Sequence, residues 1–171
     1  MACALTSGYT PGCRDSAGGV RNVYFAVFDN VSGVTSSAGV ITAIAKANGG
    51  RFYKYNLQRA TAEATEEFQD SAENGTSFYA LALNIILNKM QATTRNEIAL
   101  LGQNRLVAVV EDQNSKFWYY GKANGLMRAG GKAGTGKALG DRNGYELNFT
   151  GDEPELALEV TSGIIAALET P

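Results

Sequence analysis

Apolar residues alternate with small or polar ones along residues 79–87, and this alternation is the clearest structural pattern in the chain. The large apolar positions are Tyr79, Leu81, Leu83, Ile85 and Leu87, and those between them include Ala80, Ala82 and Asn84. Because successive side chains of a strand point to opposite faces, this pattern predicts a strand with one face buried against a core.

Similar patterns recur on both sides of this segment, separated by turn residues. Residues 20–29 and 105–112 carry apolar residues on both faces, which predicts strands covered on both sides. Further strands are predicted at residues 40–47, 51–58, 116–121, 145–150 and 156–168. Asn48-Gly49-Gly50 predicts a hairpin turn, and Asn74-Gly75 predicts another turn. We therefore expect a mainly β chain folded as an antiparallel β-sandwich or barrel.

A single short α-helix is predicted to begin near Thr94. Thr94 precedes Glu97 at the spacing of a capping box. Apolar residues that include Ile98 fall on one side, and Gly102 or Asn104 ends the helix. A helix of about ten residues is stable only when it is packed, so we expect it to flank the sheet.

Residues 61–68 also alternate, and one of their faces is acidic. Glu63 and Glu67 share this face with two threonines, and alanines occupy the other face. Threonine favours strands, so the segment is predicted to be a strand with an acidic, solvated face. The glutamates and alanines leave a helix as the alternative.

The length of 171 residues suits one domain. Residues 1–19 are small, polar and glycine-rich, which predicts an N-terminal arm. Residues 20–171 are expected to form the single sandwich or barrel domain. Within it, residues 124–140 contain six glycines and no periodicity, so we expect a long flexible loop there.

Charge is segregated along a chain whose net charge is only −2. Residues 61–73 and 146–169 carry acids without bases, whereas residues 113–140 carry bases without acids. Such zones either pair between neighbouring subunits or form solvated faces beside a mobile loop. The net charge provides no overall basic field that would attract nucleic acid.

Catalytic chemistry finds little support in the composition. The chain contains no histidine, which excludes Ser-His-Asp and Cys-His catalysis and histidine metal ligation. Cys3 and Cys13 are too few for a zinc site; two reduced thiols are expected, with a disulfide as the alternative. No pair of carboxylates has the apolar surroundings that sugar hydrolysis requires. We therefore expect no enzyme, no cofactor and no metal.

The opening residues contain neither a basic segment nor an apolar core, so no signal peptide is expected. The longest apolar stretch near the C-terminus, residues 164–168, is too short to cross a bilayer. We expect a protein made in the cytoplasm, without a membrane partner.

The glycine-rich segment suggests a nucleotide-binding alternative. Gly131 to Lys137 fit the spacing GxxxxGK, in which backbone N–H groups hold phosphates and the lysine neutralises them. The next residue is Ala138, which has no oxygen for magnesium, and the flanking residues do not predict a buried strand and a long helix. Chance composition is the preferred interpretation, and nucleotide binding through Lys132 and Lys137 is the alternative.

Four consecutive aromatic residues, FWYY at 117–120, lie between Lys116 and Lys122. Aromatic residues flanked by bases can form a stacking surface for single-stranded nucleic acid. Strand aromatics more commonly pack in a core or an interface, and this is the preferred interpretation.

Three stretches of the chain resemble small virion proteins of tailed bacteriophages, particularly the tail tube proteins. These stretches are MACALTSGY at residues 1–9, RNEIALL at 95–101 and GKALGDRNGYELNFTG at 136–151. The resemblance implies a β-sandwich or barrel with one flanking helix, whose copies form rings, usually hexameric, that stack into a hollow tube. It further implies contacts with other tail proteins, a place in the virion tail, and passage of DNA through a polar, often acidic lumen.

The resemblance also assigns expected roles to individual residues. Glu63 and Glu67 are the candidate lumen-facing acids. The candidates for contacts between subunits or rings lie in the glycine-rich segment and are Gly125, Met127, Arg128, Lys132 and Lys137. A head–tail connector or a capsid decoration protein remains the alternative within the virion class.

Overall fold

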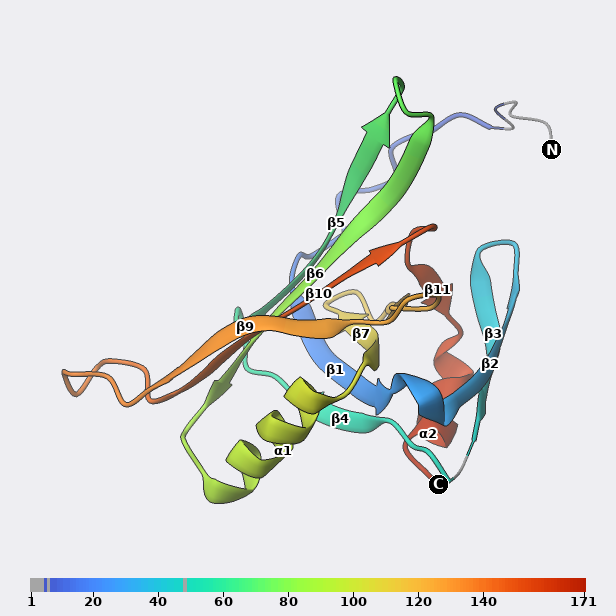
Figure 1. Ribbon diagram of the computed structural model, residues 1–171. Coiled ribbons are helices and arrows are strands. Elements are labelled where there is room, and N and C mark those ends of the chain that lie inside the picture. Colours follow the sequence, from blue (N-terminus) through green and yellow to red (C-terminus); the bar gives the residue numbers. More distant parts are fainter. Residues whose placement is uncertain (1–4, 6, 48) are drawn as a thin grey trace.

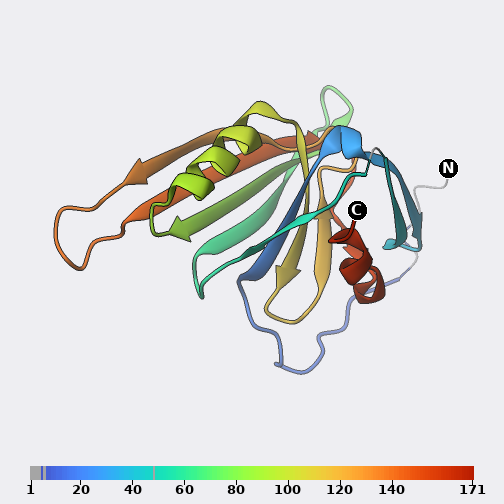
Figure 2. The same ribbon diagram turned by 90° about the horizontal axis from the view of Figure 1, so that it is seen from below.

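The computed structural model describes residues 5, 7–47 and 49–171, and it confirms the predicted mainly β fold. Two sheets face each other across an apolar core, with a helix packed beside them (Figure 1). A shorter helical segment lies near the C-terminus (Figure 2). It packs on the larger sheet, on the face that points away from the smaller sheet. The predicted β-sandwich with a short flanking helix is therefore correct.

Sheet A has seven strands in the order β2-β3-β11-β8-β7-β1-β4. Its neighbouring strands are antiparallel except β3 and β11, which are parallel. The strands are β1 Val20–Val27, β2 Val31–Ser37, β3 Val40–Lys46, β4 Tyr53–Asn56, β7 Leu106–Asp112, β8 Phe117–Tyr120 and β11 Leu158–Val160.

Sheet B has four strands in the order β5-β6-β10-β9, and all of its pairs are antiparallel. The strands are β5 Ala62–Ser71, β6 Thr76–Asn88, β9 Met127–Gly134 and β10 Gly144–Glu153. The β5–β6 hairpin extends beyond the end of β10 and projects away from the rest of the molecule (Figure 1).

The main core fills the space between the two sheets. Phe25 of β1 and Phe149 of β10 meet there with their ring centroids 5.0 Å apart. The alternate positions Leu81, Leu83 and Ile85 of β6 are buried in the same cluster, which confirms the alternation of this strand. The inner face of sheet B is thus fixed against sheet A by apolar burial.

A second core covers the opposite face of sheet A. The C-terminal segment, with the 3-10 helix η2 Ser162–Ile164 and helix α2 Ile165–Leu168, contributes Ile165 and Leu168 to it. Val107 and Val109 of β7 point into this second core, and Ala108 and Val110 point into the first. This arrangement explains why β7 is apolar on both faces. A 3-10 helix, η1 Phe28–Asn30, joins β1 to β2.

Helix α1 spans Ala92–Gln103 and packs at the β9 edge of sheet B. Its buried residues Ile98 and Leu101 join the core between the sheets, so α1 lies on the same side of sheet B as sheet A. The predicted capping box is wrong, because Gln91 is the N-cap and no side chain caps the helix.

Several sequence predictions are corrected by the topology. The segment 124–140 is not a long loop, because β9 occupies Met127–Gly134 and pairs along β10. Residues 156–168 form only the short strand β11 before turning helical. Asn48 lies outside the described residues, but β3 and β4 on its two sides do not pair, so the hairpin predicted there is wrong. Strand β2 was not predicted at all.

The described part of the N-terminal arm, residues 5 and 7–19, contains no helix and no strand. Its end is held where the Ala17 N–H donates to the Asn114 side chain and the Gln113 N–H donates to the Gly19 carbonyl. Cys13 is an exposed free thiol, and Cys3 lies outside the described residues. Within the described residues, no helix is long and apolar enough to cross a membrane.

We expect Phe149→Ala to destabilise the fold by about 3–5 kcal/mol, because the ring is fully buried between the sheets. Urea unfolding followed by tryptophan fluorescence measures the change. Phe68→Ala is the matched control: this side chain is 64% exposed, so a loss of less than about 1 kcal/mol is expected. Equal losses in the two variants would contradict the position of the core.

Candidate functional site

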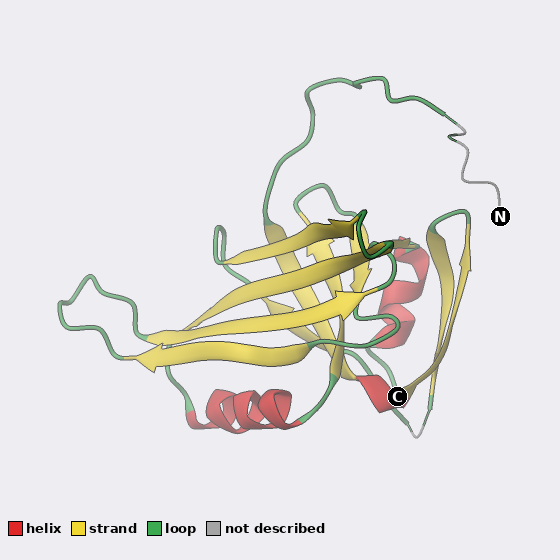
Figure 3. Cartoon of the chain, turned by 45° about the horizontal axis from the view of Figure 1, so that its top comes forward, coloured by secondary structure: helices red, strands yellow, loops and turns green. Residues whose placement is uncertain are grey.

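The face of sheet B that points away from sheet A is the candidate site. The register of the strands places the following residues on this outer face: Glu63, Thr65 and Glu67 of β5; Ala80, Ala82, Asn84 and Ile86 of β6; Glu146, Asn148, Thr150 and Asp152 of β10; and Lys132 of β9. Figure 3 shows sheet B in front of sheet A, with α1 below it at the β9 edge. The outer face is therefore not covered by the elements that build the core.

The outer face is mainly polar, and it carries four acidic residues against one base. Glu63, Glu67 and Asp152 are exposed on it. Asn148 donates a hydrogen bond of 2.5 Å to Asn84 across the sheet. The acids lie on β5 and β10, and the outer-face positions of β6 between them are mostly small or apolar and partly exposed.

A cluster of opposite charges lies at one end of this face. Lys132 approaches Glu146 to 3.0 Å, and Arg142 pairs with the same carboxylate. The hydrogen bond from the Lys132 ammonium lowers the pKa of the Glu146 carboxyl below its ordinary value, and the Arg142 charge adds to this. Lys132 is the one cation among the outer-face residues named above, so the rest of the face keeps its negative charge.

Both edges of sheet B are open. Within the described residues, β5 pairs only with β6, and β9 pairs only with β10. Every residue of β9 is exposed, and neither edge strand contains proline. Open strand edges are templates for pairing with another chain unless the protein blocks them.

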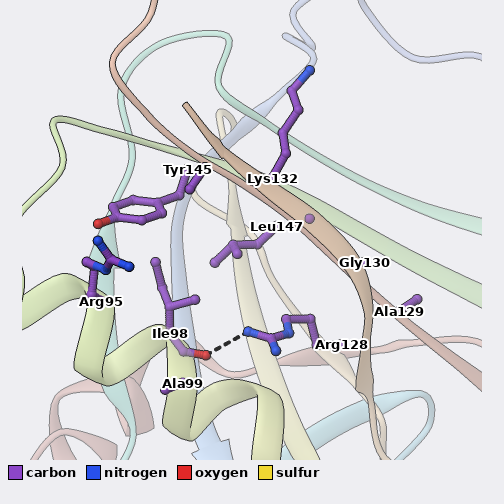
Figure 4. Close-up of a pocket in the computed structure, with 11 residues that line it drawn as sticks. Arg95, Ile98, Ala99, Arg128, Ala129, Gly130, Lys132, Tyr145 and Leu147 are labelled. Carbon is purple, nitrogen blue, oxygen red and sulfur yellow. Dashed lines mark hydrogen bonds between the residues drawn. The ribbon is translucent and has the colours of Figure 1, made fainter. Parts of the chain in front are cut away.

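A groove of about 580 Å³ runs between α1 and the open edge of β9 (Figure 4). Ile98, Tyr145 and Leu147 give it apolar walls, and Arg95 and Arg128 supply positive charge. Arg128 donates a 3.0 Å hydrogen bond to the Ile98 carbonyl. Among the described residues, neither arginine has a carboxylate within ion-pair distance.

The structure separates the predicted contact residues of the glycine-rich segment. Met127, Arg128 and Lys132 lie on β9, with Arg128 directed to the groove side and Lys132 to the outer face (Figure 4). Lys137 lies in the exposed turn between β9 and β10. Gly125 is buried before β9, so it does not lie in an accessible loop.

Gly125 has a conformational role. Its φ is +78°, and an added Cβ would lie 2.7 Å from Cγ of Arg105. Only glycine meets both demands at this position. Gly125 therefore fixes the backbone that leads into β9.

Glu153 binds the backbone of the same segment, and no role was predicted for this residue from the sequence. Its side chain is almost fully buried, and its carboxylate accepts hydrogen bonds from the N–H groups of Ala123, Asn124 and Gly125 at 2.8, 2.8 and 3.1 Å. In the sequence Glu153 belongs to the acidic segment 146–169, a pattern that is typical of a solvated surface. Its partners precede it by nearly thirty residues, so no local pattern reveals them.

The nucleotide-binding alternative does not fit the fold. The GxxxxGK segment lies on the edge strand β9 and in the turn after it, and the next element is the strand β10. The N–H groups of Lys137 and Ala138 both donate to the Asp141 carboxylate at 2.8 Å, which lowers its pKa. The amides that would hold a phosphate are occupied by the protein's own anion.

The aromatic run belongs mainly to the core. Tyr119 and Tyr120 are buried in the two core clusters, which confirms the packing role predicted for them. The indole N–H of Trp118 donates to Asp112 at 3.3 Å. In the part of the chain that the structure describes, no three His, Cys, Asp or Glu side chains group as metal ligands.

Comparison with known proteins gave no relatives. No protein family model, no curated protein and no solved structure matches the chain. Inferences about function therefore rest on the residues and on the geometry described above.

We expect Glu153→Gln to destabilise the fold by about 2–4 kcal/mol, because the amide NH₂ would face backbone N–H donors in a buried site. Chemical denaturation measures the loss. Glu155→Gln is the control, since Glu155 forms only an exposed ion pair with Lys122, worth less than about 1 kcal/mol. A Glu153→Gln variant as stable as this control would refute the claim that Glu153 stabilises the segment before β9.

Proposed function

We propose that this protein is a structural subunit that assembles with copies of itself into rings, and that the rings stack into the tail tube of a tailed bacteriophage. The single observation that carries the proposal is sheet B, which has an uncovered acidic face between two open edges. The protein acts through its shape and surface, without catalysis or a cofactor. Its place is the virion tail, where it also contacts other tail proteins.

The two open edges are complementary in direction. The strands of sheet B alternate, so β5 and β9 run antiparallel to each other. When copies stand side by side in the same orientation, β9 of one copy runs antiparallel to β5 of the next. Because the joined surfaces differ, the contact is heterologous, and such contacts close into rings when the rotation allows it. Antiparallel pairing would satisfy the edge groups of both strands.

A ring closed in this way has two different surfaces. Sheet A and α1 lie on the core-facing side of sheet B. In the proposed ring they are placed on the outside, and the opposite face of sheet B lines the lumen. Glu63, Glu67 and Asp152 then project into the channel. Negative side chains repel the phosphates of DNA, which lets DNA pass without sticking.

Other exposed segments of the chain are available for contacts between stacked rings. Residues 72–77 at the tip of the β5–β6 hairpin are exposed, as are Leu5 and Tyr9 of the N-terminal arm. The turn with Lys137 projects at the opposite end of sheet B from that hairpin. We expect the combined interfaces to exceed about 2,000 Å² in total, as in obligate assemblies.

The alternative virion roles share self-association but not the shape. Stacking of rings into a tube distinguishes the proposed role from that of a head–tail connector or a capsid decoration protein. The nucleotide-binding alternative has no supporting observation, because Asp141 occupies the amides of the motif.

We expect negative-stain microscopy of the purified protein at high concentration to show rings or tubes of uniform diameter. The physical reason is that the open edge of β9 in one copy pairs with the open edge of β5 in the next, and all copies keep the same orientation. A folded protein that stays monomeric at high concentration in several salts would contradict the proposed function. Particles of another regular shape would favour a connector or decoration protein.

Reversing charge on the lumen face should make tubes retain DNA. In Thr150→Lys/Asp152→Lys, both changes lie on the middle strand β10, away from the edges. We expect short duplex DNA to sediment with these tubes at low salt and to be released as salt rises. Thr42→Lys/Glu169→Lys carries the same change of charge at exposed positions outside sheet B. Equal retention of DNA by the control tubes would refute the lumen assignment.

A further inference from the structure

We propose that β5 of one copy pairs with β9 of the next in one defined register, with Glu67 opposite Lys132 and Phe68 opposite Gly131. This register inserts Phe68 into the groove between α1 and β9 of the neighbouring copy. The inference rests on the proposed self-assembly and adds to it the residues that make the contact. The occupant of the groove is thus a second copy of this chain.

The lengths and faces of the two strands limit the registers. Strand β5 has 10 residues and β9 has 8, with Ala129 as an extra residue opposite the bond between Asn148 and Phe149. A continuous sheet keeps core-facing residues beside core-facing residues, so registers differ by steps of two. Only two of these registers place every residue of β9 next to a residue of β5. They place Gly134 opposite Thr65 or opposite Glu63.

Charge selects between these two registers. With Gly134 opposite Thr65, Lys132 meets Glu67 on the outer face, and Arg128 meets Asp70 on the groove side. With Gly134 opposite Glu63, Lys132 meets Thr65 and Arg128 meets Phe68, and neither direct pair of opposite charges forms. Opposite charges placed directly across a strand pair are favourable, so the first register is preferred.

The groove side gives an independent argument for the same register. An added Cβ at Gly131 would lie 2.5 Å from the Glu146 carbonyl oxygen, so this position carries no side chain. Gly131 lines the groove together with the apolar Ile98 and Leu147. An aromatic ring from the adjacent strand covers an edge glycine and fills the space that it leaves. Phe68 is the residue that the first register places there.

Phe68 is available for this contact. Phe68 is 64% exposed although it belongs to the core-facing side of β5, and it lies three residues before the end of this strand at Ser71. Among the described residues, its one aromatic neighbour is Tyr79, at 5.4 Å between ring centroids. In the groove, Phe68 would lie beside the guanidinium groups of Arg95 and Arg128, which bind favourably to the face of an aromatic ring.

Pairing in this register also changes the lumen. Lys132 would lie between Glu146 of its own strand pair and Glu67 of the next copy. The charge of Glu67 is then largely balanced at the subunit boundary. Glu63 and Asp152 remain as the free acids of the channel.

Disulfide cross-linking tests the register directly. In a background with Cys3 and Cys13 replaced by serine, we expect Thr65→Cys/Gly134→Cys tubes to give a ladder of covalent oligomers after oxidation. Directly opposite strand residues lie about 4.5–5.5 Å apart between Cα atoms, within disulfide range. Gly134 has no atoms within 4 Å of an added Cβ, so the cysteine fits.

The matched control keeps the same partner and shifts the other cysteine by two positions. In Glu63→Cys/Gly134→Cys, the two Cα atoms would be about 8 Å apart, beyond disulfide range. If tubes form and only this control cross-links, or neither pair does, the register is wrong and the proposed function stands. If the unmodified protein forms neither rings nor tubes, the proposed function fails and this inference fails with it.

A second variant tests the groove. We expect Phe68→Ala to raise the protein concentration needed for assembly by about tenfold and to leave the melting temperature of the unassembled chain unchanged within about 2 °C. Phe78→Ala is the control, because Phe78 lies on β6 of the same hairpin and points to the outer face. Assembly of Phe68→Ala at the concentration required by the control would refute insertion into the groove.

Discussion

The backbone of a β-strand carries N–H and C=O groups on both of its sides, and each group needs a hydrogen-bond partner. In sheet B the two middle strands, β6 and β10, have partners on both sides, and within the part of the chain that the structure describes the two edge strands have them on one side only. Strands β5 and β9 therefore retain a row of groups that another chain can satisfy. Since these strands differ in sequence and direction, a copy that uses one edge leaves the other edge free for the next copy. The proposed ring follows from this constraint.

The rest of the molecule holds this sheet in place. Sheet A is covered on both faces by two apolar clusters, whereas sheet B is covered on its inner face. Phe149 fixes the middle of sheet B against sheet A, and Glu153 fixes the backbone that enters β9. A rigid edge pairs with less loss of conformational entropy than a mobile one. The division into a buried framework and an exposed sheet thus connects the packing of the chain to its proposed assembly.

The sequence predicted those parts of the fold in which side chains determine the structure. The alternation in β6 and the apolar run in β7 each reflect burial, and the acidic face of β5 lies where alternation placed it. Strand β9 escaped prediction because its residues, MRAGGKAG, are all exposed and its strand form depends on backbone pairing with β10. The role of Glu153 depends on distant partners, and the groove depends on how α1 docks, so neither is visible in local spacing. Glu63, Glu67, Arg128 and Lys132 were named from the sequence as candidates, and the strand register shows which faces of sheet B they occupy.

Amide hydrogen exchange in assembled and unassembled protein tests the central claim most directly, because it reports the hydrogen bonding of the two edges themselves. The proposed pairing predicts that peptides covering β5 and β9 become strongly protected on assembly, while those covering β6 and β10 change little, since both of their sides are already paired. Assembled particles in which β5 and β9 exchange as fast as in the free chain would contradict pairing through these edges.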